Sequence, residues 1–169
     1  MVAGFSLGYL LLWGLIATVA MTTVLQGSLG LHFSRMSLPF LVGAFFTGDR
    51  RWALILGFLV YTAGGWGFAF FYFLIFAGVH IYTWWFGALC GFLHGAILLV
   101  FALPLLPAIH PRMASNYHGV TSRRQLEPPG FMGLNYGRGA PITTLLGQVL
   151  YGTALGGFLQ LQHVAGIGQ

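Results

Sequence analysis

Charged residues are scarce in this sequence of 169 residues: they make up only 5% of it, and lysine is absent. Soluble globular domains carry about 25% charged residues, so the sequence lies far outside that class. The only acids are Asp49 and Glu127, and the single cysteine, Cys90, excludes an intramolecular disulfide. Seven arginines give a formal net charge of +5, which is too small for a nucleic-acid-binding surface. We therefore expect no nucleic acid among the partners.

Signatures of catalysis are scarce as well. The sequence contains no Walker-type phosphate loop, and its six histidines lack the HxxxH and HExxH spacings of a zinc hydrolase. The apolar segments contain no carboxylate that could relay protons. We therefore expect that the protein is not an enzyme and that it holds no metal through a histidine cluster.

Four long apolar segments dominate the sequence. A helix needs about 20 apolar residues to cross roughly 30 Å of hydrocarbon, and four uncharged segments meet this requirement. They are residues 4–31, 52–76, 84–106 and 142–161. The first lacks the basic region of a secretory signal and exceeds its apolar core of about 7–15 residues, which favours a transmembrane helix over a targeting peptide. We predict an all-α, polytopic membrane protein with one membrane domain over residues 1–169.

All formal charges fall in the two longer connections, residues 32–51 and 107–141. With four spans, these two connections lie on the same side of the membrane. Short arginine-bearing loops stay in the cytoplasm. We therefore predict a multi-pass protein of a bacterial inner membrane, cytoplasmic or intracytoplasmic. Both termini would face the periplasm, and the arginine-bearing loops would face the cytoplasm.

The first of these connections contains a short helical pattern over residues 37–47. Its apolar side chains recur at helical spacing, Ser37 is a suitable N-cap, and Pro39 fits the first turn. We predict a short amphipathic helix that lies in the membrane interface.

Glycine recurs every fourth residue in two of the spans. Gly87, Gly91 and Gly95 form one stripe, and Gly152 and Gly156 form another. Such stripes let helix backbones approach closely in lipid. We predict that they pack helices within the bundle; docking against a helix of another protein is the alternative.

The second span is aromatic around most of its circumference, with the run "GFAFFYFLIF" at residues 67–76. Packing against lipid or within the bundle explains such a run. The alternative is contact with a flat apolar ligand such as a quinone, a carotenoid or a chlorin.

The fourth span carries Thr144, Gln148 and Tyr151 on one face, and His94 lies near the middle of the third span. If the two helices touch, the neutral imidazole finds a hydroxyl or amide partner there, which removes the cost of an unpaired polar group in hydrocarbon. These four residues are the predicted intramembrane polar contacts.

A functional interpretation of His94 is axial ligation of a haem iron or a chlorophyll magnesium, because neutral histidine is the commonest metal ligand. An ionisable group inside a membrane is also a functional candidate by default. The small Gly91 and Gly95 would then give the macrocycle room. The remaining histidines lie at span ends or in connections, so none supplies a second axial ligand.

The sequence resembles a family of small four-helix bacterial integral membrane proteins, a domain of unknown function. The similar pieces are "ATVAMTTVL", "LPFLVGAFFTGD", "FGALCGFLHGAILLVFALPLLPAIHPRM" and "GLNYGRGAP…LLGQVLYG". The resemblance implies the fold and no reaction. It also implies a Gly-His pair where this sequence has Gly147-Gln148, so a two-histidine site across the third and fourth spans would be lost here.

Three functions follow as hypotheses. The first is a non-catalytic accessory subunit of a larger membrane complex, photosynthetic (reaction centre and light harvesting) or respiratory, with the lipid bilayer and other subunits as partners. The second is a homo-oligomeric transporter or channel, whose path would be lined by Thr18, Thr22, Gln26, Thr144, Gln148 and Tyr151. The third is a haem- or chlorophyll-binding protein that uses His94.

Overall fold

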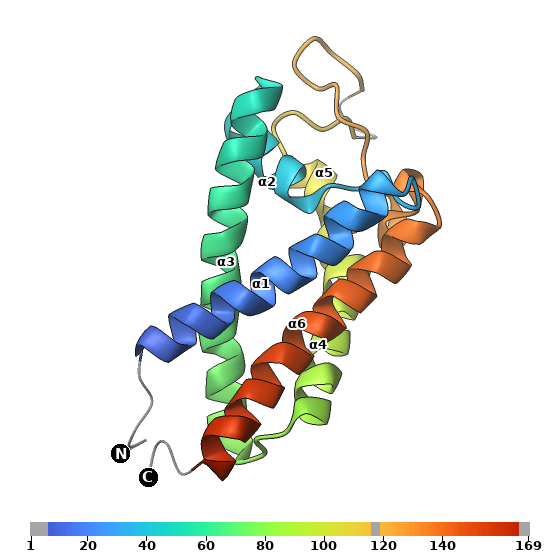
Figure 1. Cartoon of the computed structure of the whole chain (residues 1–169). Coiled ribbons are helices and arrows are strands. Elements are labelled where there is room, and N and C mark those ends of the chain that lie inside the picture. The colour runs from blue at the N-terminus through green and yellow to red at the C-terminus, as the bar shows by residue number, and fades with distance from the viewer. Residues whose placement is uncertain (1–6, 116–118, 166–169) are drawn as a thin grey trace. The chain divides into compact units, whose positions relative to one another are not determined.

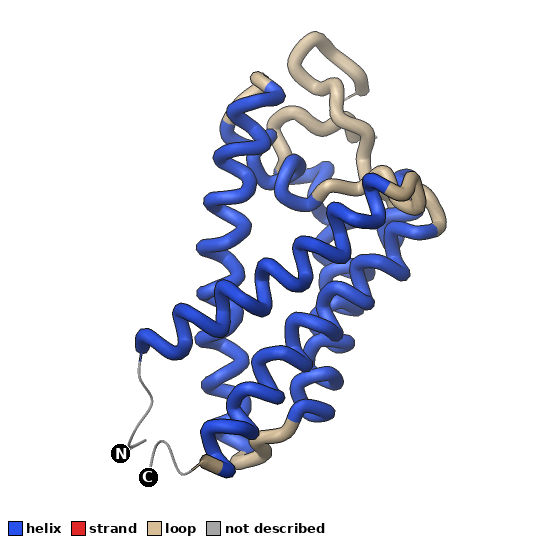
Figure 2. The backbone as a smooth tube through the Cα atoms, viewed as in Figure 1, coloured by secondary structure: helices blue, strands red, loops and turns tan. Residues whose placement is uncertain are grey.

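The computed structural model describes residues 7–115 and 119–165 (Figure 1). Residues 4–6 of the first predicted span lie outside the described residues. Helices and loops account for the described part of the chain, which contains no strand beyond one isolated bridge (Figure 2). The helical elements are α1 (Leu7–Gly30), α2 (Leu38–Phe46), α3 (Arg50–Val79), α4 (Trp84–Ile97), η1 (Leu98–Ala102), α5 (Leu103–Ile109), η2 (Phe131–Tyr136) and α6 (Gly139–Val164).

Four of the helical stretches are long and apolar enough to cross a membrane: α1, α3, the continuous stretch Trp84–Ile109, and α6. The prediction of an all-α protein with four spans is confirmed. Several helices run up to three residues past the predicted ends, for example to Val79 instead of residue 76 and from Gly139 instead of residue 142. The sequence boundaries marked where apolar character fades, whereas a helix continues as long as its backbone hydrogen bonds do.

The third span contains an irregularity that the sequence prediction treated as regular helix. Residues Leu98–Ala102 form a π-helical turn, in which the backbone N–H of Leu103 donates to the carbonyl oxygen of Leu98. Pro104 explains it, because proline has no N–H to donate and its ring clashes with the carbonyl four residues earlier. A π-turn widens the helix at this point and lets the chain continue through the proline.

The chain divides into two compact units. Unit 1 consists of residues 1–24, 62–95 and 145–169, and unit 2 consists of residues 25–61 and 96–144. Parts of α1, α3, α4 and α6 therefore belong to each unit.

In unit 1, α4 and α6 touch through their backbones. A Cβ added to Gly87 would overlap the carbonyl oxygen of Gly152, and one added to Gly152 would overlap that of Gly87. Gly91 lies in the same way against the carbonyl oxygen of Gln148, and Gly156 against that of Thr83. The two glycine stripes thus lie against each other within the chain. Only glycine permits a contact this close.

Unit 1 also contains a close crossing of α1 and α3. Gly65 leaves the space that the side chain of Thr18 fills, and Gly14 leaves the space for Ala69. The indole Nε1 of Trp66 donates a 2.9 Å hydrogen bond to the carbonyl oxygen of Leu11. On α6, Phe158 stacks on Trp13 of α1, with ring centroids 3.8 Å apart. Small residues and stacked rings therefore hold α1 to both neighbours.

In unit 2, α2 begins as the sequence predicted: Ser37 is the N-cap, and its hydroxyl accepts the backbone N–H of Phe40 at 3.4 Å. The helix packs tightly on α3, because Cβ atoms on Gly43 and Gly57 would overlap the carbonyl oxygens of Ala53 and Pro39. One face of α2 is therefore covered by α3. Phe45 and Phe46 at its C-terminal end stay exposed.

The long connection of unit 2 is tied to the segment before α2. The backbone N–H of Arg35 donates to the carbonyl oxygen of Tyr136, and the Arg35 guanidinium donates to that of Asn135 at 2.6 Å. Arg35 also lies 3.7 Å from the carboxylate of Glu127. The Tyr136 hydroxyl donates to the carbonyl oxygen of Glu127 at 2.5 Å. Burial, and next the Glu127 charge, raise the pKa of Tyr136 to about 12 although Arg35 opposes the shift.

Candidate functional site

The histidine of the third span pairs with a tyrosine of the second. The hydroxyl oxygen of Tyr72 on α3 lies 3.3 Å from Nδ1 of His94 on α4. The imidazole tautomer sets the direction of this hydrogen bond. The ring of Phe68, one turn before Tyr72, lies 4.3 Å from the imidazole, centroid to centroid, at an interplanar angle of 38°. His94 is thus held by α3 on one ring edge and one ring face.

Tyr151 of α6 extends this group. Its ring stands perpendicular to that of Tyr72, with centroids 5.5 Å apart. Its hydroxyl donates a 2.5 Å hydrogen bond to the carbonyl oxygen of Gly65 on α3. Tyr151 and Tyr72 are almost fully buried, at 1% and 3% exposure. We call Phe68, Tyr72, His94 and Tyr151 the His94 cluster; it joins three helices within unit 1.

The sequence placed the partner of His94 on the fourth span, and the structure corrects this. The hydrogen bond of His94 goes to Tyr72 on the second span, a residue that sequence reasoning counted only among the aromatics. Tyr151 belongs to the cluster through Tyr72. The spacing across the short link between the two spans could have found Tyr72, since it lies seven residues before the end of α3 and His94 lies ten residues after the start of α4.

The other two predicted polar residues of α6 are buried, and each has a side-chain oxygen without a hydrogen-bond partner in the described chain. Gln148 is 4% exposed and Thr144 is 1% exposed. Within the described chain, neither Oε1 of Gln148 nor Oγ1 of Thr144 has a hydrogen-bond partner. The aliphatic part of Gln148 lies against the space beside Gly95. Gln148 therefore acts in helix packing, and Thr144 belongs to unit 2.

The geometry limits how His94 could hold a cofactor. The space beside Gly91 and Gly95, which the sequence analysis reserved for a macrocycle, is filled by backbone and side chains of α6. A macrocycle would have to approach His94 from another direction. The ring nitrogen available to it would be Nε2, because Nδ1 lies at the Tyr72 hydroxyl. Among the described residues, no group of three His, Cys, Asp or Glu could hold a metal ion.

A second polar arrangement lies in unit 2 just after α5. The imidazole Nε2–H of His110 donates to the carbonyl oxygen of Leu41 at 3.0 Å, and its Nδ1 accepts the backbone N–H of Arg112 at 3.2 Å. Both ring nitrogens of a neutral imidazole are satisfied in this way. Burial is the main cause that lowers the pKa of His110, and the Arg112 charge adds to it, while the bond to Leu41 acts in the opposite direction.

Arg112 fastens the end of α2. Its Nη1 donates to the carbonyl oxygens of Ala44 at 2.8 Å and Phe45 at 2.9 Å. A cation at the C-terminus of a helix satisfies its last carbonyls and complements its dipole. In the sequence, Arg112 is one of the arginines of the connection 107–141, which indicate only the topology. The contact depends on how residues 112 and 44 are brought together, which no local pattern encodes.

These features define a class, the polytopic helical membrane protein with a tightly packed glycine interface. No protein-family model, curated protein or solved structure matches the chain. Its function is therefore inferred from its own residues.

Proposed function

We propose that the protein is a non-catalytic accessory subunit of a larger membrane assembly. The observation that carries this proposal is the contrast between its helices. In the most apolar 18-residue window of each span, α6 has 50% of its residues buried, whereas α3 has only 17%. A bundle that leaves so much of three apolar helices uncovered offers wide surfaces to lipid and to other membrane helices.

The polar groups of unit 1 support a structural role. The hydroxyl of Thr18 donates to the carbonyl oxygen of Gly14 at 2.7 Å, and that of Thr22 donates to the carbonyl oxygen of Thr18 at 2.6 Å. These hydroxyls, which a transport path would need, are bound to their own helix. In the His94 cluster the hydrogen bonds likewise join helices: that of Tyr72 goes to His94, and that of Tyr151 goes to the carbonyl oxygen of Gly65. The proposal of an accessory subunit thus has more support than that of a transporter or channel.

The finer assignment is part of the same proposal. We place the chain in a bacterial inner or intracytoplasmic membrane, in the small four-helix family that it resembles. The arginine-bearing connections would face the cytoplasm and both termini the periplasm, as the positive-inside rule requires. A photosynthetic reaction-centre and light-harvesting complex, or a respiratory complex, would use exposed aromatics such as Phe68, Phe70 and Phe71 for subunit and pigment contacts.

Extraction of a tagged chain in mild detergent tests the proposal. We expect the protein to migrate on a native gel with a complex much larger than its own 18.4 kDa, in fixed ratio to other subunits. Migration only as a monomer or as a small homo-oligomer would contradict it. A pool of free chain at high expression serves as the internal reference for the unassembled form.

A second candidate is pigment or haem binding at His94, which one observation favours. When Nδ1–H of an imidazole donates to a neighbouring oxygen, the lone pair of Nε2 is free for a metal, and the neighbour orients the ring. Tyr72 stands where this neighbour is needed. A visible absorption band that disappears in H94L would support this candidate. A colourless preparation from the native membrane would reject it.

A further inference from the structure

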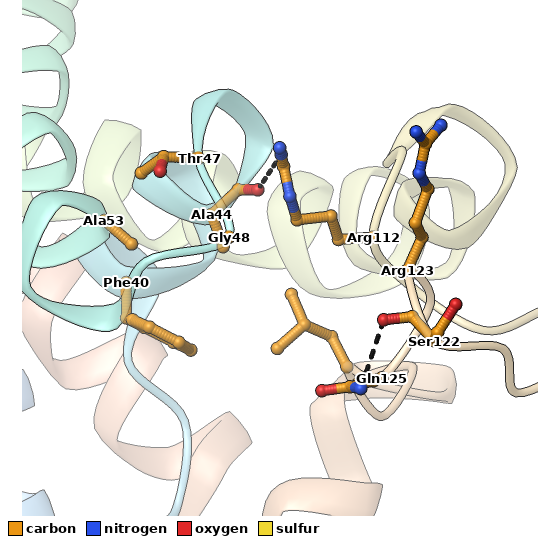
Figure 3. A pocket seen from close by; sticks show the side chains of 10 residues that line it. Phe40, Ala44, Thr47, Gly48, Ala53, Arg112, Ser122, Arg123 and Gln125 are labelled. Carbon is orange, nitrogen blue, oxygen red and sulfur yellow. Dashed lines mark hydrogen bonds between the residues drawn. The ribbon is translucent and has the colours of Figure 1, made fainter.

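A cavity of about 230 Å³ lies in unit 2, beside the C-terminal end of α2 (Figure 3). Its walls come from the end of α2, the first turn of α3 and the chain that follows α5. The polar part of the lining consists of Arg112, Arg123, Thr47, Ser122 and Gln125, and no carboxylate belongs to it. The cavity therefore has two positive charges, of which that of Arg112 is held in place, and several hydrogen-bonding groups, which is the chemistry of an anion site.

Arg112 lines this cavity and uses only one nitrogen of its guanidinium for hydrogen bonds to the described residues. Its Nη1 is held by Ala44 and Phe45, as the dashed line to Ala44 in Figure 3 illustrates. Its Nε and Nη2 donate to no acceptor among the described residues. A Cβ on Gly48 would lie 3.4 Å from Nε, so glycine at this position keeps that edge accessible. Two parallel N–H groups on a fixed guanidinium match two oxygens of a phosphate.

The positive charges of the cavity are not neutralised by the acids of the chain. Oδ1 of Asp49 accepts the backbone N–H of Trp52 at 2.9 Å, where it caps α3. Glu127 lies beside Arg35. Within the described residues, Arg112 and Arg123 thus have no carboxylate partner. An anion from outside the chain would supply the missing negative charge.

The cavity lies beside the ends of two membrane-spanning helices, within reach of lipid headgroups. α3 begins at Arg50, and the third span ends at Ile109, three residues before Arg112. The lining also includes Ala53 in the first turn of α3. Ends of membrane-spanning helices lie at the depth of lipid headgroups, where arginines meet lipid phosphates. The cavity is smaller than the pocket of about 300–1,000 Å³ that a larger organic ligand occupies, and it has room for a phosphate group.

We propose that this cavity binds a phosphate group, with the free edge of Arg112 and the Arg123 guanidinium as its cationic ligands. Ser122 and Thr47 would add hydroxyl groups at its margin. The phosphate belongs either to the headgroup of an anionic membrane lipid or to a soluble phosphate. This site concerns unit 2 alone and does not depend on the proposed function.

Binding of single lipids to the detergent-purified full chain, followed by native mass spectrometry, tests the proposal. The probes are phosphatidylglycerol, phosphatidylcholine and inorganic phosphate. We expect R123Q to weaken phosphatidylglycerol binding about fivefold, because one arginine near a membrane surface contributes about 1 kcal/mol. The matched control is R124Q, which removes the same charge at the next residue. The Arg124 side chain does not line the cavity, so we expect binding to change less than about twofold.

A second variant tests the site without a change of charge. G48A places a methyl group beside Nε of Arg112, and we expect it to weaken binding of the same probe as R123Q does. Tight phosphatidylglycerol binding that inorganic phosphate displaces only at high concentration identifies a lipid headgroup as the source. Binding of inorganic phosphate alone, with the same dependence on Arg123, identifies a soluble phosphate. Equal effects of R123Q and R124Q, or no effect of R123Q and G48A on any probe, overturn the proposal.

Discussion

Tyr72 and His94 lie 3.3 Å apart, hydroxyl oxygen to Nδ1, and this pair connects the interiors of two membrane-spanning helices. Each group alone would be an unpaired polar group in an apolar environment, which is costly. Together they form a hydrogen bond between helices that Phe68 and Tyr151 surround with aromatic rings. The pair thus explains how α4 tolerates a histidine at mid-span.

The first prediction concerns this pair. In a double-mutant cycle of Y72F and H94L, we expect a coupling free energy of about 0.6 kcal/mol, and at most about 1.7 kcal/mol, as for other hydrogen bonds between membrane helices. The measurement is the free energy of unfolding in mixed detergent micelles, followed by tryptophan fluorescence. Y82F is the control, because Tyr82 stacks on His163 and not on His94. Fully additive effects of Y72F and H94L would show that the two groups do not interact.

The second prediction tests the glycine interface of α4 and α6. G152A puts a methyl group onto the carbonyl oxygen of Gly87, and overpacking of this kind costs about 1–3 kcal/mol. We expect that loss in the free energy of unfolding. G157A is the matched control five residues further along α6, where the nearest atom to a new Cβ is 3.7 Å away. If both variants are equally stable, the two backbones are not in contact.

The third prediction concerns the crossing of α1 and α3. A Cβ on Gly65 would collide with the side chain of Thr18, whereas one on Gly64 meets no atom within 4 Å. We expect G65A to lower the thermal unfolding midpoint and G64A to leave it unchanged or raise it, since alanine favours a helix by up to about 1 kcal/mol over glycine. T18A in the G65A background should restore part of the loss. No rescue by T18A would place the strain of G65A elsewhere.

The sequence predicted the four spans because about 20 apolar residues in a row have few alternatives to a helix across a bilayer. It predicted the short helix over residues 37–47 from its cap and spacing, and α2 spans Leu38–Phe46. The spacing of the glycines also indicated that Gly87, Gly91, Gly152 and Gly156 form contact surfaces, because small residues at a spacing of four form a stripe on any helix. These signals are local, so the sequence contains them directly.

The side-chain contacts that could not be predicted from the sequence depend on which helices become neighbours. The hydrogen bond of His94 goes to Tyr72 on α3, and no spacing along one helix specifies that choice. The hydrogen bond from Arg112 to the carbonyl oxygen of Ala44 at the end of α2 joins residues 68 positions apart. The π-turn before Pro104 was within reach of sequence reasoning, since a proline inside a span disrupts the regular hydrogen bonds.

The fourth prediction is a pH dependence due to His110. Its side chain is 3% exposed, faces Arg112 and lies perpendicular to the ring of Phe45, and burial lowers its pKa from the ordinary value of 6.5. The unfolded chain therefore binds a proton at this residue more readily than the folded chain. Its contribution to stability is complete above about pH 6.5 and is lost as the pH falls further.

The variant H110Q checks this dependence. Its amide can donate to the carbonyl oxygen of Leu41 and accept the N–H of Arg112, but it does not titrate. We expect the unfolding midpoint of the wild type to fall between about pH 7 and pH 5 by more than that of H110Q. Parallel pH profiles for the two proteins would mean that His110 is protonated as readily in the folded as in the unfolded state.

Photo-crosslinking in the native membrane tests the central claim, that this chain is a subunit of a larger assembly. A photoreactive residue is placed at one exposed apolar position of each span, Val19, Phe71, Phe92 and Leu146, and at the fully buried Phe76 as control. The account predicts a crosslink of defined mass to a different polypeptide from at least one exposed position and none from residue 76. Adducts with lipid or with a second copy alone, at all four exposed positions, would contradict it.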